Sequence, residues 1–331
     1  MSKRDYSRRE FLRRNSIAGL GVVLAPGVAQ SLFANTLTGR INVNSALHGE
    51  PIIDIHQHTN YVGRGDDHLL AHQRAMGITT TILQPAGHPV DYGSTYYGVG
   101  NGLQAEATGN EECYNLARKY PQEFLFGANE VPDLPGAVKE IEKYLKLGAR
   151  VIGESKFGVE CDSPEMQMIY KLAEKYHVPV LMHWQHNMYN RGYERFHKML
   201  QKYPGVNFIG HAQTWWANID KNNKDQNILY PKTKLSPGGL TDRLLSDYPN
   251  LFGDLSAGSG LNSLTRDEER TPDFLKRHQD KLLFGSDCSD KPGIGPDCTG
   301  SQIIEAIRRL SPSKEIERKL LFENAKKLFR L

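Results

Sequence analysis

Eight short β-rich runs alternate with amphipathic helical stretches from residue 51 onwards, and this alternation constrains the fold more than any other feature. The runs expected to be strands are Ile52–His58, Thr79–Gln84, Glu123–Glu130, Ala149–Lys156, Pro179–His183, Val206–Gly210, Leu251–Leu255 and Leu282–Ser286. Apolar residues recur at three- and four-residue spacing in helical stretches between them, such as Leu134–Leu147, Pro164–Tyr176, Asp242–Tyr248 and Ser301–Leu310. Such alternation favours a parallel sheet, and eight units in 331 residues predict a single-domain α/β protein, a (β/α)8 TIM barrel.

Two long segments, Ala86–Asn110 and Gln213–Gly239, interrupt the rhythm of strands and helices. Both follow expected strands, and the loops that follow the strands of such a barrel surround its catalytic mouth. We therefore expect both segments to lie over the functional site.

The N-terminal segment has the features of an export signal. Ser7-Arg8-Arg9-Glu10-Phe11-Leu12-Arg13 resembles the twin-arginine signal, and the apolar stretch that follows, 17–25, is too short to span a bilayer. We therefore expect residues 1–35 to be a signal peptide, 36–50 a linker and 51–331 the barrel. The implied partner is the twin-arginine export machinery. The implied location is outside the cytoplasm, in the periplasm, without a stable membrane anchor.

The charge balance argues against a nucleic-acid partner. The formal net charge is +3, but the first 35 residues hold six basic and two acidic side chains, which leaves a nearly neutral mature chain. Four cysteines, Cys113, Cys161, Cys288 and Cys298, are too few for a disulfide scaffold. Four unpaired buried thiols are the favoured interpretation, with a Cys288–Cys298 bridge as the alternative outside the cytoplasm.

Histidines and acids stand at the ends of several expected strands. In the first strand Asp54, His56 and His58 are two apart, so simple alternation points them into the barrel and points Ile53, Ile55 and Gln57 outwards. Further strands end in His183, in His211 and in Asp287. Imidazole and carboxylate groups at matching strand ends predict a shared metal site, with zinc or a similar divalent ion as the expected cofactor.

Together these sequence features resemble the amidohydrolase superfamily, and more narrowly its amidohydrolase-2 branch of lactonases and non-oxidative decarboxylases. The resemblance covers nearly the whole mature chain and rests on 54–58, 179–183, 210–211, 248–256, 283–287 and the closing 324–329. It implies that His56, His58, His183 and Asp287 bind the metal. It also leaves room for a homo-oligomer, because barrels of this family are often dimeric or larger.

Glu154 departs from the mononuclear pattern of that branch. A glycine and glutamate at the end of the fourth strand are similar to binuclear barrel hydrolases, in which the glutamate bridges two ions. The hypothesis is one ion on His56, His58 and Asp287 and a second on His183 and His211, with Glu154 between them. One ion, a carboxylated Lys156 as the bridge, or an ion pair between Glu154 and Lys156 are the alternatives.

The expected chemistry is attack of metal-activated water on an ester, lactone or amide bond of a small substrate. Asp287 is the expected proton acceptor, and the metal, or His211 if it is not a ligand, would polarise the substrate carbonyl. Residues beside the strand ends are candidate contacts for a cyclic, sugar-like or aromatic substrate: Lys156, Trp184, His186, Trp215 and Trp216. The rival hypotheses are a decarboxylase on the same metal site and a non-catalytic exported protein that binds metal or sugar.

Overall fold

The computed structural model describes residues 49–96 and 102–331. The expected signal peptide, residues 1–35, and nearly all of the expected linker, residues 36–50, lie outside the described residues. Export by the twin-arginine machinery therefore stays a prediction. Within the described ranges no helix is both long enough and apolar enough to cross a membrane.

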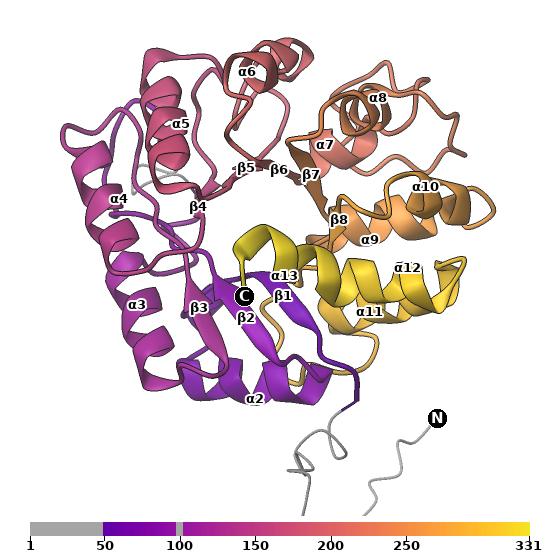
Figure 1. The fold of residues 1–331 in the computed structure, drawn as a ribbon, viewed down its shortest axis with the longest axis horizontal. Coiled ribbons are helices and arrows are strands. Elements are labelled where there is room, and N and C mark those ends of the chain that lie inside the picture. Colours follow the sequence, from indigo (N-terminus) through magenta and orange to yellow (C-terminus); the bar gives the residue numbers. More distant parts are fainter. Residues whose placement is uncertain (1–48, 97–101) are drawn as a thin grey trace, which may run out of the picture. The chain divides into compact units, whose positions relative to one another are not determined.

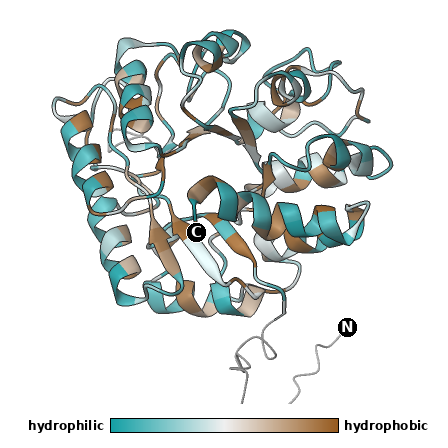
Figure 2. Cartoon of the chain, in the orientation of Figure 1, coloured by the Kyte–Doolittle hydropathy of each residue, from teal (hydrophilic) through white to brown (hydrophobic). Residues whose placement is uncertain are grey.

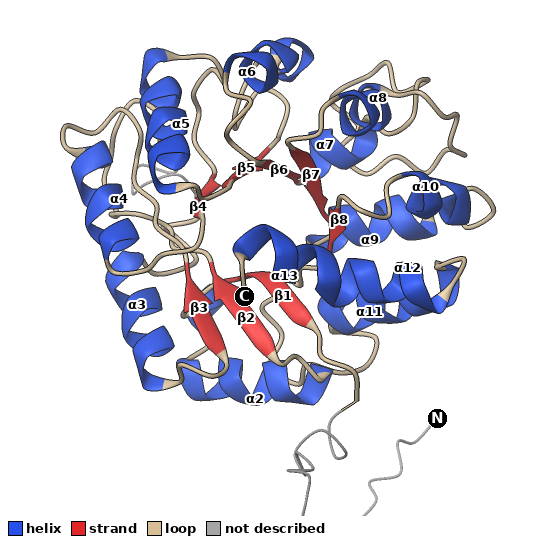
Figure 3. Cartoon of the chain, in the orientation of Figure 1, coloured by secondary structure: helices blue, strands red, loops and turns tan. Residues whose placement is uncertain are grey.

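Eight parallel strands form the inner ring of the molecule (Figure 3). They are β1 Ile53–Gln57, β2 Thr80–Leu83, β3 Phe124–Phe126, β4 Ile152–Ser155, β5 Val180–His183, β6 Phe208–His211, β7 Leu251–Asp254 and β8 Leu282–Leu283. Strands β1 to β3 pair in order, and so do β4 to β8. A parallel bridge between Ala128 and Ile152 joins the two sets. The amide of Ile55 donates to the carbonyl of Phe284 and closes the ring from β8 to β1, which confirms the expected barrel.

Helices surround this ring on the outside (Figure 1). They are α2 Asp66–Met76, α3 Asn110–Lys119, α4 Ala137–Lys146, α5 Pro164–Tyr176, α6 His197–Lys202, α7 Gln213–Ala217, α8 Leu240–Asp247, α9 Ala257–Thr265, α10 Thr271–Arg277, α11 Thr299–Leu310 and α12 Lys314–Arg318. Short helical turns lie at η2 Tyr61–Gly63, η3 Tyr193–Arg195 and η4 Lys319–Glu323. The beginning of α5 shows how the sequence sets a boundary. The Ser163 hydroxyl accepts from the Met166 amide, and Pro164 occupies the first turn.

The last helix, α13 Asn324–Phe329, differs from the others because it packs against the inside of the strand ring (Figure 1). Its Ala325, Leu328 and Phe329 join one apolar cluster with residues from seven strands and with Val151, which directly precedes β4. Only the interior of a barrel is shared by all eight strands. Several strands are brown in Figure 2, and the helices around them mix brown and teal residues, as expected for helices that pack one apolar face on the strands.

Strand β1 corrects the expected alternation of side chains. Ile53 and Ile55 belong to the inner cluster, whereas Asp54 points towards α2, where its carboxylate accepts from the Gln73 amide at 2.7 Å. Ile53, Asp54 and Ile55 thus alternate normally, but in the opposite phase to the expected one. The β1–β2 register then shifts between Asp54 and Gln57, which breaks the two-residue period. His56 faces inwards after this irregularity.

All four cysteines are unpaired and buried, which confirms the interpretation as free thiols.

Candidate metal centre

The six side chains expected to bind metal meet at the carboxyl ends of the strands. His56 is the next-to-last residue of β1, and His58 directly follows that strand. The other four side chains come from four further strand ends: Glu154 from β4, His183 from β5, His211 from β6 and Asp287 after β8. Three residues of the inner apolar cluster come just before a site histidine on their strands: Ile55, Leu181 and Ile209. The site therefore lies directly above the inner cluster, at the end of the barrel opposite to α13.

Gly285 allows β8 to come close enough to complete this ring. A Cβ atom at this position would lie 2.6 Å from Asp254 Oδ1 and 2.9 Å from the Cβ of His56. The chain then continues to Asp287, whose amide donates to the carbonyl of His56 at 2.8 Å. A larger residue at position 285 would push Asp287 away from the β1 histidines.

The hydrogen bonds of His56 and His58 fix which ring nitrogens face the site. His58 Nδ1 lies 2.7 Å from the carbonyl oxygen of Gln84, and His56 Nδ1 lies 2.7 Å from Asp254 Oδ2. Both oxygens only accept, so both Nδ1 atoms donate. In the neutral rings the two Nε2 atoms then carry lone pairs, and they lie 3.2 Å apart. Two lone pairs at this distance call for a cation.

Glu154 spans the two pairs of imidazoles. Its Oε2 lies 3.5 Å from Nε2 of both His56 and His58. Its Oε1 lies 2.5 Å from His183 Nδ1 and 3.7 Å from His211 Nε2. One carboxylate oxygen thus faces each histidine pair, which is the placement that a bridging carboxylate requires.

Asp287 faces the same centre from the opposite side of the mouth. Its Oδ1 is buried without a hydrogen bond and lies 3.4 Å from His58 Nε2 and 4.0 Å from His56 Nε2. Its Oδ2 lies 3.5 Å from His211 Nε2. An orphaned carboxylate oxygen among imidazole nitrogens is a group arranged for a positive charge.

The electrostatics of the buried groups lead to the same conclusion. Burial would lower the pKa of His56, but Asp287 and Glu154 raise it well above its usual value. Despite burial, the pKa of Glu154 is held well below its usual value by His183 and His56. Burial lowers the pKa of His183 to about 4, against the opposing effect of Glu154. The carboxylates therefore stay ionised and attract positive charge to this point.

Two polar residues at the end of β7 and just after it, Asp254 and Ser256, support the ligands and were not assigned a role from the sequence. Asp254 Oδ2 accepts from His56 Nδ1 and from the Ser256 hydroxyl at 2.8 Å, and it lies 3.3 Å from His211 Nδ1. Ser256 Oγ lies 3.0 Å from the same nitrogen of His211. Support of this kind orients ligating imidazoles. An acid at the end of the seventh strand was the signal that could have identified Asp254.

Tyr61 is a further neighbour that the sequence did not indicate. Its ring packs edge-on against His58 with the centroids 4.8 Å apart. The charge of Asp287 and then burial raise the pKa of its hydroxyl, so the hydroxyl keeps its proton. Tyr61 can therefore offer a hydrogen bond beside Asp287.

The candidate substrate contacts fall into two groups. Lys156 is half-buried and its Nζ lies 5.7 Å from the centre of the Tyr189 ring, which packs edge-on against His183. Within the described residues no ion pair joins Lys156 to Glu154. His186 and Trp184 line a pocket of about 480 Å³ beside the β5 and β6 loops.

The other two tryptophans lie in the packing layer between strands and helices. Trp215 and Trp216 are buried in the outer hydrophobic cluster, and the indole of Trp216 donates to the carbonyl of Asp254 at 2.9 Å. Trp184 belongs to the same cluster and packs between Tyr193 and Phe196. This packing, rather than an aromatic wall over the substrate, accounts for their burial.

The residues at the mouth fit a divalent metal. Ligand atoms that lie within 4.8 Å of one another form three overlapping groups: His56, His58 and Glu154; His56, His211 and Asp287; and Glu154, His183 and His211. Imidazole nitrogens with carboxylate oxygens suit zinc, manganese or iron.

Solved structures of other barrels share this fold. An uncharacterized TIM-barrel protein from Bordetella bronchiseptica is 16% identical, with a TM-score of 0.55 over 85% of this chain and 99% of that one. A probable 2-pyrone-4,6-dicarboxylic acid hydrolase from Acinetobacter baumannii is 13% identical, with a TM-score of 0.54 over 85% and 99% of the chains. The 5-carboxyvanillate decarboxylase of Novosphingobium aromaticivorans, solved with manganese, is 13% identical, with a TM-score of 0.53 over 87% and 98%. A search of curated proteins finds no match.

A closed parallel barrel with imidazoles and carboxylates at its strand ends is the architecture of metal-dependent barrel enzymes. A family model described as Amidohydrolase matches residues 53–331. The chain therefore belongs to this amidohydrolase family, whose members are metal-dependent enzymes that include hydrolases and decarboxylases.

Proposed function

We propose that this protein is a metal-dependent hydrolase that cleaves an ester, lactone or amide bond of a small substrate by attack of water. The observation that carries the proposal is the position of Asp287. Its Oδ1 is buried, makes no hydrogen bond and lies within 4.0 Å of two imidazole nitrogens. A carboxylate so placed can take a proton from water held at the centre.

We further propose that two divalent ions bind, one to His56, His58 and Asp287 and one to His183 and His211, with Glu154 shared between them. The two oxygens of Glu154 each face one histidine pair, which supports a bridging role. When bound, such ions lower the pKa of coordinated water towards neutrality and polarise a carbonyl group.

The chain's own residues then supply positioning and proton transfer. Asp287 accepts the proton of the attacking water at Oδ1 and returns it to the leaving group. The Tyr61 hydroxyl, which keeps its proton beside Asp287, can hold the substrate oxygen by donating a hydrogen bond. Asp254 keeps Nδ1 of His56 protonated, so that its Nε2 faces the centre.

Replacement of Asp287 by asparagine tests this role. We expect kcat on a panel of lactones, esters and amides to fall by about 10² to 10⁴-fold, the usual contribution of a general base, with an unchanged circular dichroism spectrum. Metal content is measured in the same samples, so that loss of turnover is separated from loss of metal. A metal-loaded Asp287→Asn protein with full turnover would contradict the proposal.

A decarboxylase on the same centre is the second candidate, and Lys156 favours it. Its Nζ lies over the Tyr189 ring, which packs against His183, and its charge helps to lower the pKa of that imidazole, so it could receive a substrate carboxylate. Carbon dioxide release from hydroxybenzoates, measured against lactone hydrolysis in the same metal-loaded preparation, separates the two reactions. Absence of both activities at full metal loading would favour the non-catalytic hypothesis.

A further inference from the structure

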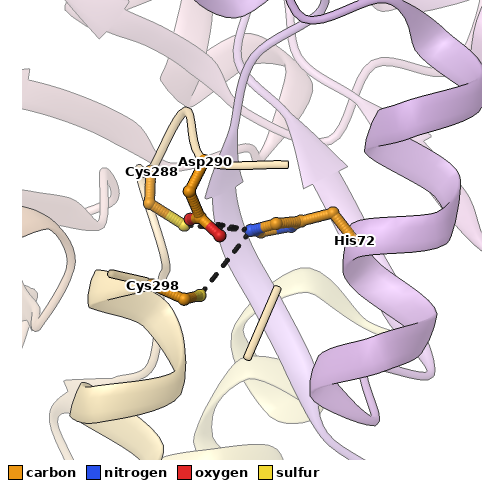
Figure 4. A group of neighbouring side chains, drawn as sticks. All are labelled: His72, Cys288, Asp290 and Cys298. Atoms are coloured by element: carbon orange, nitrogen blue, oxygen red, sulfur yellow. Dashed lines mark hydrogen bonds and ion pairs between the residues drawn. The ribbon is translucent and has the colours of Figure 1, made fainter. Parts of the chain in front are cut away.

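A second group of metal-ligand side chains lies outside the barrel mouth. His72 comes from α2, Cys288 and Asp290 from the segment after β8, and Cys298 from the residue that caps α11 (Figure 4). Their candidate ligand atoms all lie within 4.8 Å of one another. The first and last of these residues are separated by more than two hundred positions in the sequence, so the fold alone brings them together.

The four side chains converge on one point. His72 Nε2 lies 3.4 Å from Cys288 Sγ, 3.7 Å from Cys298 Sγ and 3.1 Å from Asp290 Oδ1. His72 and Cys298 are fully buried, Cys288 is nearly so, and Asp290 is half-buried. Figure 4 shows the sulfur atoms and the carboxylate gathered around the edge of the imidazole ring.

A chain of hydrogen bonds determines which nitrogen of His72 carries the proton. The Gln73 amide nitrogen donates to Asp54 Oδ2 and to Thr81 Oγ1, both at 2.7 Å. Gln73 Oε1 must therefore face His72 Nδ1, 2.9 Å away, and this nitrogen donates. In the neutral ring the lone pair of Nε2 then points at the two sulfurs and at Asp290. Such support of the second ring nitrogen is usual for a ligating histidine.

The spacing of these atoms fits tetrahedral zinc. With Zn–S about 2.3 Å and Zn–N and Zn–O about 2.0 Å, a tetrahedron has S···N edges of about 3.5 Å and an N···O edge of about 3.3 Å. The distances in the structure, 3.4, 3.7 and 3.1 Å, lie within a few tenths of an ångström of these values. We propose that His72, Cys288, Asp290 and Cys298 bind a structural zinc ion, separate from the metal centre at the barrel mouth.

Four protein ligands leave no open position, so this ion stabilises and does not catalyse. The site would connect α2 to the segment that follows β8. Cys288 adjoins Asp287, and the Gln57 amide donates to the Cys288 carbonyl at 3.0 Å. The zinc ion would thus hold the segment that carries Asp287 against the body of the barrel.

The same four side chains have two alternative states that bind no zinc. In the first, His72 is an imidazolium ion paired with Asp290, and its Nε2 has no lone pair for a metal. In the second, the two thiols form a disulfide, which lowers the intact mass by about 2 Da, the mass of two hydrogen atoms. Both states are outcomes of the test below, and either would overturn the proposal.

Cobalt substitution distinguishes this site from the mouth. Among the described residues the candidate ligands at the mouth are imidazole and carboxylate groups, so a sulfur-to-cobalt charge-transfer band reports on thiolates that bind the ion elsewhere. Reduced full-length protein is titrated with Co²⁺ until all sites are filled, and we expect the final intensity of this band to correspond to one thiolate-bound ion per chain. Absence of the band, with cobalt bound at the mouth, would overturn the proposal without the need for any variant.

Variants then assign the band to its ligands. The Cys288→Ser/Cys298→Ser protein should lose the band and contain one zinc per chain less than the wild type, whatever the mouth binds. Cys161→Ser is the matched control, because Cys161 is also buried but its Sγ donates to the Gly192 carbonyl at 3.3 Å, outside the cluster. It should keep both zinc and band. Equal zinc content in all three proteins would overturn the proposal, as would a wild-type mass that shows a disulfide.

Discussion

Replacement of Asp254 by asparagine perturbs the metal centre without removing a ligand. Oδ1 of this fully buried carboxylate accepts from the Ser256 amide at 3.0 Å, and Oδ2 accepts from His56 Nδ1 at 2.7 Å. An asparagine side chain has one oxygen, so it can satisfy only one of these donors and presents an N–H group to the other. In either orientation His56 loses a charged acceptor.

The expected size of the effect follows from this lost contact. Hydrogen bonds to charged groups contribute about 1.5–3 kcal/mol, and loss of the partner of a ligating histidine usually weakens metal binding about 10 to 100-fold. At about 1.4 kcal/mol for each factor of ten, the two ranges agree. We therefore expect the Kd for the ion that His56 would hold to rise by about one to two orders of magnitude.

Competition against a fluorescent chelator at neutral pH measures this Kd. Asp242→Asn is the matched control, because Asp242 is also a buried carboxylate that lies 2.6 Å from a histidine nitrogen, His278 Nε2, but it belongs to α8, outside the mouth. The control should lower stability and leave metal affinity unchanged. If Asp254→Asn binds metal as tightly as the wild type, or if both variants weaken binding equally, the assigned role of Asp254 is wrong.

Three further predictions concern the bridge, an ion pair and the inner core. Glu154→Gln should lower the metal content of the mouth from two ions to one, because an amide offers one neutral oxygen, and unchanged elemental analysis would contradict the bridge. Hydrogen bonds and charges from His278 and Arg277 outweigh burial and lower the pKa of Asp242 from 3.8 to about 2. Its ionised form therefore adds about 2 kcal/mol to stability above pH 4, lost as the pH falls towards 2. In urea unfolding, the free energies of unfolding of the wild type and Asp242→Asn should converge as the pH falls from 4 towards 2. A difference that stays constant with pH would exclude a contribution from ionised Asp242. Phe329→Ala should lower the free energy of unfolding by about 3–5 kcal/mol, and a loss below about 1 kcal/mol would show that α13 is not part of the core.

The sequence was sufficient for the barrel and for the convergence of six side chains at its mouth, but not for Tyr61, Asp254 and Ser256. Apolar runs that end in His183 and His211 place these side chains at neighbouring strand ends, because parallel strands align their carboxyl ends. Their β5–β6 register pairs the two residues directly. Strand order and burial follow from the same repeating pattern, which is local and therefore visible in the sequence.

The parts that the sequence did not predict depend on irregular geometry or on distant contacts. The register shift in β1 after Asp54 lets both Ile55 and His56 face inwards, and no pattern in the sequence marks that irregularity. The tryptophans 215 and 216 are close to His211 in the chain, yet α7 turns them into the outer layer. The cluster of His72 and Cys298 joins segments 226 positions apart. Its assembly depends on how α2 and α11 pack.

The position of α13 inside the ring also has a consequence for the order in which the barrel is completed during synthesis. Each βα unit can begin to pair with the previous one as it leaves the ribosome. The inner apolar cluster below the metal centre, however, also needs Ala325, Leu328 and Phe329 from α13. Until these residues have been made, the barrel interior at the end opposite to the metal centre stays open to water. The inner cluster on which the strand ends rest is then incomplete. The metal centre should therefore mature late, after the polypeptide has been translated through position 329.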